Sequence, residues 1–221
     1  MNDKTQGTQN ESGNIVGSLL RSPQKVTEAI AGQHQIIKSS LYLLMAGVIC
    51  HAVFGLAIGL YAGTAVAPMT IVKIPLVAVC SFLICFPSLY VFTCVAGSPL
   101  TLSQAFMLGS SCMAMTGLIL VGLAPVAWLF AVSTENISFV VMLALIIWLL
   151  AAMFTARYVN RMNENKAFQH QAGIKVWFVI LTIVTMQMVT YLRPILVKPE
   201  NGWWTANKMF FLEHFGSALN D

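Results

Sequence analysis

Long apolar runs alternate with short polar breaks over most of this chain. Between Lys38 and Arg157 the sequence has two formal charges, Lys73 and Glu135, and each lies in a break between two apolar runs. A water-soluble domain needs charged residues over its surface, so a stretch of this kind is suited to lipid instead. Because about 20 apolar residues cross a bilayer as a helix, the pattern predicts a polytopic membrane protein.

The runs predict five membrane spans joined by short loops, in an all-α transmembrane helical bundle. They cover residues 39–61, 74–96, 105–132, 139–156 and 176–192. Pro75 is expected in the first turn of the second span, after a loop over residues 62–73 that contains Pro68. The third run exceeds the length of one crossing, so it must tilt, kink at Pro125 or protrude.

Polar segments flank this transmembrane domain, which we place at residues 39–196. Residues 1–13 are polar and lack aromatic side chains, so we expect a disordered tail. Residues 14–38 combine helically spaced aliphatic residues with charged ones, which favours an amphipathic cytoplasmic segment at the membrane surface over a solvated linker. In the aromatic-rich outer tail at 197–221, Trp203 and Trp204 are expected at the membrane–water interface.

The distribution of lysine and arginine predicts how the bundle is oriented. With the N-terminus in the cytoplasm, the inner segments hold Lys4, Arg21, Lys25, Lys38, Arg157, Arg161, Lys166 and Lys175. The outer segments then hold Lys73, Arg193, Lys198 and Lys208. Because basic residues are enriched in cytoplasmic loops, we expect N-in and C-out, in a bacterial inner membrane.

Composition restricts the class of function. Hydrophobic residues make up 57% of the chain and charged residues 9%, and the dispersed net charge of +4 does not indicate nucleic acid as a partner. The sequence has no Gly-rich phosphate loop, no HExxH or GxSxG motif and no Asp within a span. The expected protein is therefore not an enzyme, binds no cofactor, and has the lipid bilayer and other membrane subunits, or itself, as partners.

The first span carries glycines at four-residue spacing. Gly47, Gly55, Gly59 and Gly63 share one helix face with His51. Small residues in this arrangement let membrane helices approach each other closely. The stripe is therefore predicted to pack against another span, in this chain or in a partner.

His51 is an ionisable group about halfway through that span. Such a residue must face the bundle interior or a wet cavity, and it is a candidate functional residue. Two interpretations stay open: a neutral imidazole hydrogen-bonded to a Ser, a Thr or a carbonyl, and a proton relay or metal ligand. The spacing of the cysteines matches no common metal site, so we expect no metal.

Four further polar residues complete the candidate intramembrane site: Ser88, Tyr90, Gln187 and Arg193. Pro87 frees the carbonyl of Leu83, and Ser88 and Tyr90 could bond either to this carbonyl or to a neighbouring helix. Gln187 is predicted on the inward face of the fifth span, and Arg193 extends to the outer interface.

Two parts of the sequence resemble the Yip1-like group of membrane proteins. The segment that begins KIP at 73–75, continues as ICFPSLY at 84–90 and ends GSPL at 97–100 is similar to the second span of uncharacterised bacterial relatives, and YLRP at 191–194 is similar to the end of their last span. The resemblance implies five spans, a polar cytoplasmic N-terminal region and an outer C-terminus. Eukaryotic members are linked to vesicle trafficking and membrane shaping, which implies a scaffold or adaptor rather than a reaction.

These features predict a non-enzymatic integral membrane protein that is a scaffold, adaptor or accessory subunit of a membrane assembly. The glycine stripe, the amphipathic N-terminal segment and the aromatic tail would be its contact surfaces. The alternative is a small-solute channel or transporter with a midplane cavity near His51, Pro87 and Gln187. Capture of a partner helix would favour the first hypothesis, and solute movement that depends on His51 would favour the second.

Overall fold

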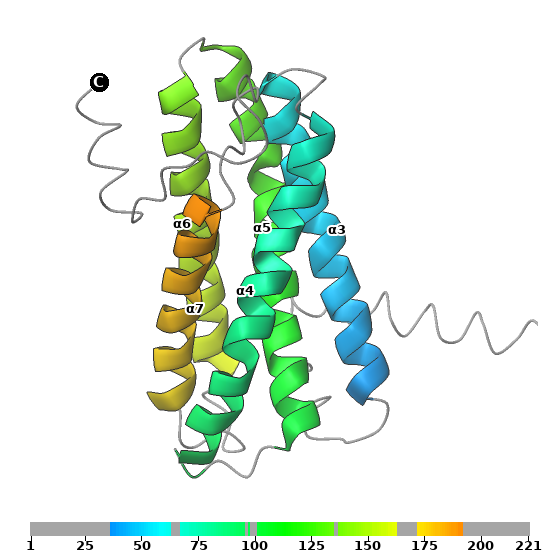
Figure 1. Cartoon of the computed structure of the whole chain (residues 1–221), viewed down its shortest axis with the longest axis vertical. Coiled ribbons are helices and arrows are strands. Elements are labelled where there is room, and N and C mark those ends of the chain that lie inside the picture. Colours follow the sequence, from blue (N-terminus) through cyan, green and yellow to red (C-terminus); the bar gives the residue numbers. More distant parts are fainter. Residues whose placement is uncertain are drawn as a thin grey trace, which may run out of the picture.

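The computed structural model describes residues 36–62, 67–95, 97, 101–134, 137–162 and 172–191. Within these ranges the chain forms α3 (Ile36–Ala62), α4 (Ala67–Val95), α5 (Leu102–Val132), α6 (Ile137–Met162) and α7 (Ala172–Tyr191). The helices lie side by side in an elongated bundle (Figure 1). The predicted all-α fold is confirmed.

Four of these helices are long and apolar enough to cross a membrane, namely α3, α4, α5 and α6. The apolar stretch of α7 is shorter, Gly173–Val189, and extends about 26 Å at roughly 1.5 Å per residue. The outward faces of the long helices carry large apolar side chains such as Ile49, Val72 and Leu129. Four of the five predicted spans are thus confirmed as helices of membrane-crossing length.

The start of α4 corrects one expectation. The helix begins at Ala67, so residues 67–73 are helical although they were predicted as a loop. Pro68 is compatible with this start, because a first-turn N–H has no acceptor within the helix. Pro75 therefore lies inside α4 and not in its first turn, and the helix also continues through Pro87.

The turn after α4 depends on Gly97. Its backbone φ is 74°, a left-handed conformation that only glycine adopts readily. Its N–H donates to the carbonyl oxygen of Cys94 at 3.0 Å, which satisfies one of the last carbonyls of the helix.

α5 is the central helix of the bundle. It opens with a capping box, in which Gln104 Oε1 accepts from the backbone N–H of Thr101 at 2.8 Å. Most of its residues between Ala105 and Gly117 are buried. The helix passes through Pro125 and ends at Val132, so the long third run is a single helix.

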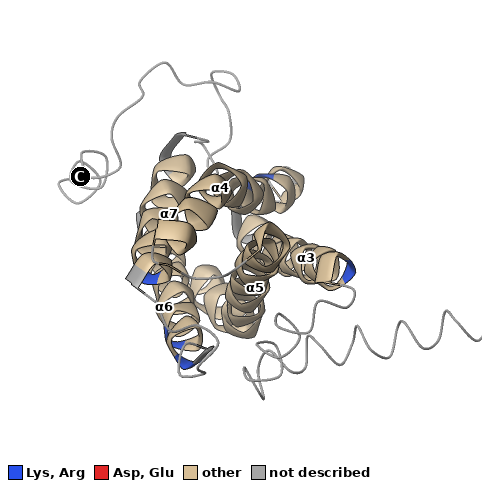
Figure 2. Ribbon diagram, turned by 90° about the horizontal axis from the view of Figure 1, so that it is seen from below, with Lys and Arg blue, Asp and Glu red and all other residues tan. Residues whose placement is uncertain are grey.

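The other three helices pack against α5 and α4. α3 packs on both of them, α6 packs mainly on α5, and α7 packs mainly on α4. Along the bundle axis the helices surround a common centre, with α3 at one edge (Figure 2). The described residues include no Asp or Glu (Figure 2). The centre of the bundle is therefore apolar apart from a few hydroxyls and one imidazole.

Candidate functional site

The glycines of α3 lie where its backbone meets two other helices. A Cβ atom on Gly47 would lie 3.1 Å from the backbone nitrogen of Ala114 in α5. A Cβ atom on Gly55 would lie 2.7 Å from the carbonyl oxygen of Thr70 in α4, and one on Gly59 would overlap the side chain of the same threonine. This face is therefore occupied by the chain's own helices, on α5 at one end and on α4 at the other, so Gly47, Gly55 and Gly59 are not the partner contact surface that the sequence suggested. Gly63 lies outside the described residues.

His51 lies at the contact between α3 and α5. The imidazole is 4% exposed, and its Nδ1 is 2.7 Å from the carbonyl oxygen of Gly47. A Cβ atom on Gly117 of α5 would lie 3.0 Å from this Nδ1, so the glycine makes room for the ring. Because a carbonyl oxygen only accepts hydrogen bonds, Nδ1 carries the proton and donates it.

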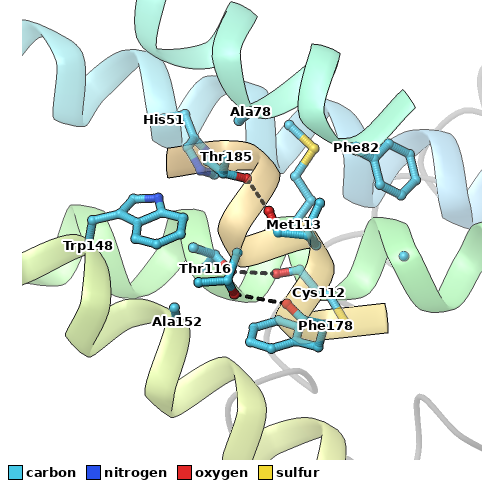
Figure 3. A pocket seen from close by; sticks show the side chains of 13 residues that line it. His51, Ala78, Phe82, Cys112, Met113, Thr116, Trp148, Ala152, Phe178 and Thr185 are labelled. Atoms are coloured by element: carbon cyan, nitrogen blue, oxygen red, sulfur yellow. Dashed lines mark hydrogen bonds between the residues drawn. The ribbon is translucent and has the colours of Figure 1, made fainter. Parts of the chain in front are cut away.

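The other side of the imidazole faces a cavity. The cavity has a volume of about 50 Å³ and is lined by residues from all five described helices (Figure 3). Thr116 from α5 and Thr182 and Thr185 from α7 supply hydroxyl groups to its wall. Aromatic rings such as Trp148 make up much of the remaining surface. His51 is the sixteenth of the 27 residues of α3 (51 − 36 + 1), so the cavity lies near the middle of the bundle.

The threonines around this cavity are hydrogen-bonded to their own helices. Thr182 Oγ1 donates to the carbonyl oxygen of Phe178 at 2.8 Å, and Thr185 Oγ1 donates to that of Leu181 at 2.7 Å. Such bonds satisfy a hydroxyl in an apolar interior without a partner from another helix. Each of these two threonines therefore has no hydroxyl hydrogen left to donate.

One pair of hydroxyls joins two helices. Thr116 Oγ1 lies 2.9 Å from Thr155 Oγ1 of α6, and each oxygen also lies 2.9 Å from a carbonyl oxygen of its own helix. The two threonines have two hydroxyl hydrogens for these three contacts. One threonine therefore donates to the other, and the threonine that accepts donates its own hydrogen to the carbonyl oxygen of its helix. The spacing of threonines along the sequence gave no sign of this pairing, because Thr155 lies in a different span.

α7 is attached to α4 by an indole group that the sequence analysis did not select. Trp177 is fully buried, and its Nε1 donates to the carbonyl oxygen of Cys85 at 2.7 Å. Ser88 Oγ donates to the same carbonyl at 2.7 Å, and not to that of Leu83 as predicted. The available signal was a tryptophan inside an apolar run, since a buried indole N–H needs an acceptor.

The remaining candidate residues do not join His51. Tyr90 is 36% exposed on the outer face of α4. Pro87 is exposed, Gln187 is half-buried, and neither lines the cavity. Arg193, Trp203 and Trp204 lie outside the described residues. Of the predicted polar site, the structure places only His51 at the cavity.

Two buried hydroxyls have no hydrogen-bond partner within the part of the chain that the structure describes. They belong to Ser81 of α4 and Tyr158 of α6. The five cysteines are free thiols. Across the described helices, no group of three or more His, Cys, Asp or Glu side chains is arranged to hold a metal ion.

No family model, curated protein or solved structure matches this chain. The class of protein therefore follows from the fold: four helices long and apolar enough to cross a bilayer, with apolar outer faces, identify an integral membrane protein. Among the described helices, a largely apolar cavity carries the imidazole of His51 and three threonine hydroxyls in its wall.

Proposed function

We propose that this protein is a non-enzymatic, five-span scaffold, adaptor or accessory subunit of a membrane assembly. The observation that carries the proposal of a fixed structural unit is the close packing, within the chain, of α3 on α4 and α5 through Gly47, Gly55 and Gly59. Backbones in such contact move little relative to each other, which suits a fixed structural unit. The resemblance of residues 84–90 and 191–194 to the Yip1-like group supports the same kind of role.

The size of the interior cavity supports this choice. Its volume is about 50 Å³, whereas sites for small organic molecules have volumes of roughly 300–1,000 Å³. A cavity of that size holds a few water molecules and not a metabolite.

The outer face of α3 is the surface that we assign to a neighbouring subunit. Leu41, Met45, Ile49 and Val53 are exposed at four-residue spacing, two positions out of step with the glycines and His51. A helix turns 100° per residue, so this aliphatic stripe lies opposite the glycine face. α3 also lies at an edge of the bundle, where a neighbour can approach it (Figure 2).

A photoreactive benzoylphenylalanine at Ile49, and another at Ile146 on α6, tests this assignment in native membranes. Both side chains are exposed, 57% and 45%, so the probe disturbs no interior contact. We expect a crosslinked protein adduct of one discrete mass from Ile49, and an adduct from Ile146 alone would move the contact surface to α6. Lipid adducts alone at both positions would contradict the proposal.

The proposal includes α7 as the fifth span, and an N-in, C-out orientation. α3 begins, α6 ends and α7 begins at the same end of the bundle (Figure 1). These helix ends carry Lys38, Arg157, Arg161 and Lys175, and such a cluster of basic residues favours the cytoplasmic side. The buried Trp177 and the apolar stretch of α7 support its place beside the four long helices.

Reporter fusions test this topology. Alkaline phosphatase fused after residue 221 is expected to be active, and a fluorescent protein at the same point is expected to be dark. A fusion after residue 166 is the matched control and is expected to give the reverse pattern. A fluorescent C-terminal fusion would show that α7 does not cross the membrane in this direction.

A small-solute channel or transporter is a second candidate, and one observation favours it. His51 is an imidazole near the middle of the bundle that lines a cavity, and such residues often mark solute or proton paths. The test is stopped-flow water and solute flux in proteoliposomes. Flux above that of empty liposomes, lost in His51→Ala, would replace the scaffold proposal with this one.

A further inference from the structure

The wall of the cavity at His51 presents several hydrogen-bond acceptors. A scaffold role does not require them, so they point to a further property of the protein. A neutral imidazole has one donor nitrogen and one acceptor nitrogen. Nδ1 is the donor, because its partner is the carbonyl oxygen of Gly47. Nε2 therefore presents a lone pair, and it has no hydrogen-bond partner among the described residues. The ring is 4% exposed and lines the cavity, so this lone pair is available to an occupant of the cavity.

The hydroxyl groups in the wall have the same character. Thr182 and Thr185 donate their hydrogens to Phe178 and Leu181 of their own helix. The hydrogen of Thr116 is committed to either the carbonyl oxygen of Cys112 or the hydroxyl of Thr155. Only lone pairs remain on these three oxygens. The imidazole and the threonine hydroxyls of the wall therefore accept hydrogen bonds, while Trp148, which also lines the cavity, carries an indole N–H donor.

The lack of acidic side chains among the described residues argues against a cation in this cavity. The described residues include no Asp or Glu (Figure 2), so no carboxylate among them compensates a cation at this depth. A charge near the bilayer midplane without such compensation is costly. The same reason keeps the imidazole neutral. A neutral donor fits the wall better than a cation does.

We propose that this cavity is a binding site for small neutral hydrogen-bond donors, occupied by a cluster of water molecules that donate to His51 Nε2 and to the threonine oxygens. A volume of about 50 Å³ exceeds the roughly 10–15 Å³ that a cavity needs to hold one water. Each water has two hydrogens and needs about two to four polar partners. The four lone-pair-bearing groups of His51, Thr116, Thr182 and Thr185 supply them.

Proton-detected solid-state NMR of the full chain in lipid bilayers tests this proposal, with water itself as the probe. Imidazole ¹⁵N labelling, with His51→Gln to assign the signal, reports the ring that lines the cavity. We expect a tautomer protonated at Nδ1, a hydrogen-bonded Nε2 shift, and magnetisation transfer from water to this ring. A non-hydrogen-bonded Nε2 without water transfer would overturn the proposal, and both signals are measured on the unmodified chain, since His51→Gln serves only to assign them.

A variant and a change of salt complete the test. Ala152 of α6 lines the cavity, so Ala152→Leu is expected to fill it and abolish water transfer while His51 is retained. Persistence of the transfer in a folded Ala152→Leu protein would place the water elsewhere and contradict the proposal. Spectra in sodium, ammonium and choline chloride are expected to be identical. A shift of Nε2 specific to sodium or ammonium would show a cation site instead. Failure of the crosslinking from Ile49 leaves all of these outcomes unchanged.

Discussion

Trp177 Nε1 donates a 2.7 Å hydrogen bond to the carbonyl oxygen of Cys85, and thereby joins α7 to α4 across 92 positions of the sequence. The indole is fully buried, so its N–H finds no water as a substitute. Ser88 donates to the same oxygen from within α4. The rotation of α7 about its own axis is fixed by this one directional bond together with the packing around the ring.

Loss of this bond is expected to weaken the docking of α7. Trp177→Phe should lower the free energy of unfolding by about 0.6–1.7 kcal/mol from the hydrogen bond, in addition to the loss from the smaller ring. Trp128→Phe is the control, because it removes the same atoms from an exposed indole of α5 that has no hydrogen-bond partner among the described residues. Unfolding in mixed micelles measures both. Equal losses would contradict a contribution from the bond to Cys85.

The close approach of α3 and α4 gives a second expectation. In Gly55→Ala, the added methyl would lie 2.7 Å from the carbonyl oxygen of Thr70, so the helices must separate. We expect a loss of about 1–3 kcal/mol. Gly122→Ala is the matched control, because no atom beyond its own stretch of helix backbone lies within 4 Å of its Cβ position. It should be neutral or stabilising, since alanine favours a helix over glycine by about 0.5–1 kcal/mol. Similar effects of the two changes would contradict the close contact.

The hydroxyls of Thr116 and Thr155 should be energetically coupled. Thr116→Val, Thr155→Val and the double variant form a mutant cycle that preserves the shape of both side chains. Hydrogen bonds between membrane helices contribute about 0.6 kcal/mol on average and up to roughly 1.7 kcal/mol, so we expect a coupling in this range. Additive effects of the two changes would show that the 2.9 Å contact stabilises nothing.

The hydroxyl of Tyr158 differs from those of Thr116 and Thr155, because its removal is not expected to destabilise the protein. This hydroxyl is buried near Ser111 but makes no hydrogen bond of proper geometry in the described part of the chain, and such a group carries a desolvation cost of about 1–3 kcal/mol. Tyr158→Phe is therefore expected to leave the free energy of unfolding unchanged or to raise it. Thermal unfolding in detergent measures this. A clear loss would show that the hydroxyl has a partner, such as a bound water.

Much of the fold follows from the pattern of apolar residues. The charge-poor stretch predicts the helices, because only lipid accommodates surfaces without charges. The four-residue spacing in α3 predicts a close helix contact on the face that carries Gly47 and Gly55, and this is where the backbones of α5 and α4 lie. The prediction that the second span begins at residue 74 was wrong, because Pro68 was taken as part of a loop. A proline also suits a first helical turn.

Other features depend on helix arrangement, which the spacing along one helix does not determine. Periodicity places residues on a common face, but it does not identify the helix that packs there. The bond from Trp177 to Cys85 and the pairing of Thr116 with Thr155 both join separate spans. Likewise, the inward face of α7 presents Thr182 and Thr185 to the cavity, while Gln187, the predicted polar residue, does not line it.

Membership of a larger membrane assembly is most directly tested by native mass spectrometry of the tagged full chain, extracted from its own membranes in lipid nanodiscs. We predict particles whose protein mass exceeds the 24.1 kDa of one chain by one or more whole subunits in a fixed ratio. Particles that contain one 24.1 kDa chain and lipid, across all extraction conditions, would contradict the scaffold assignment.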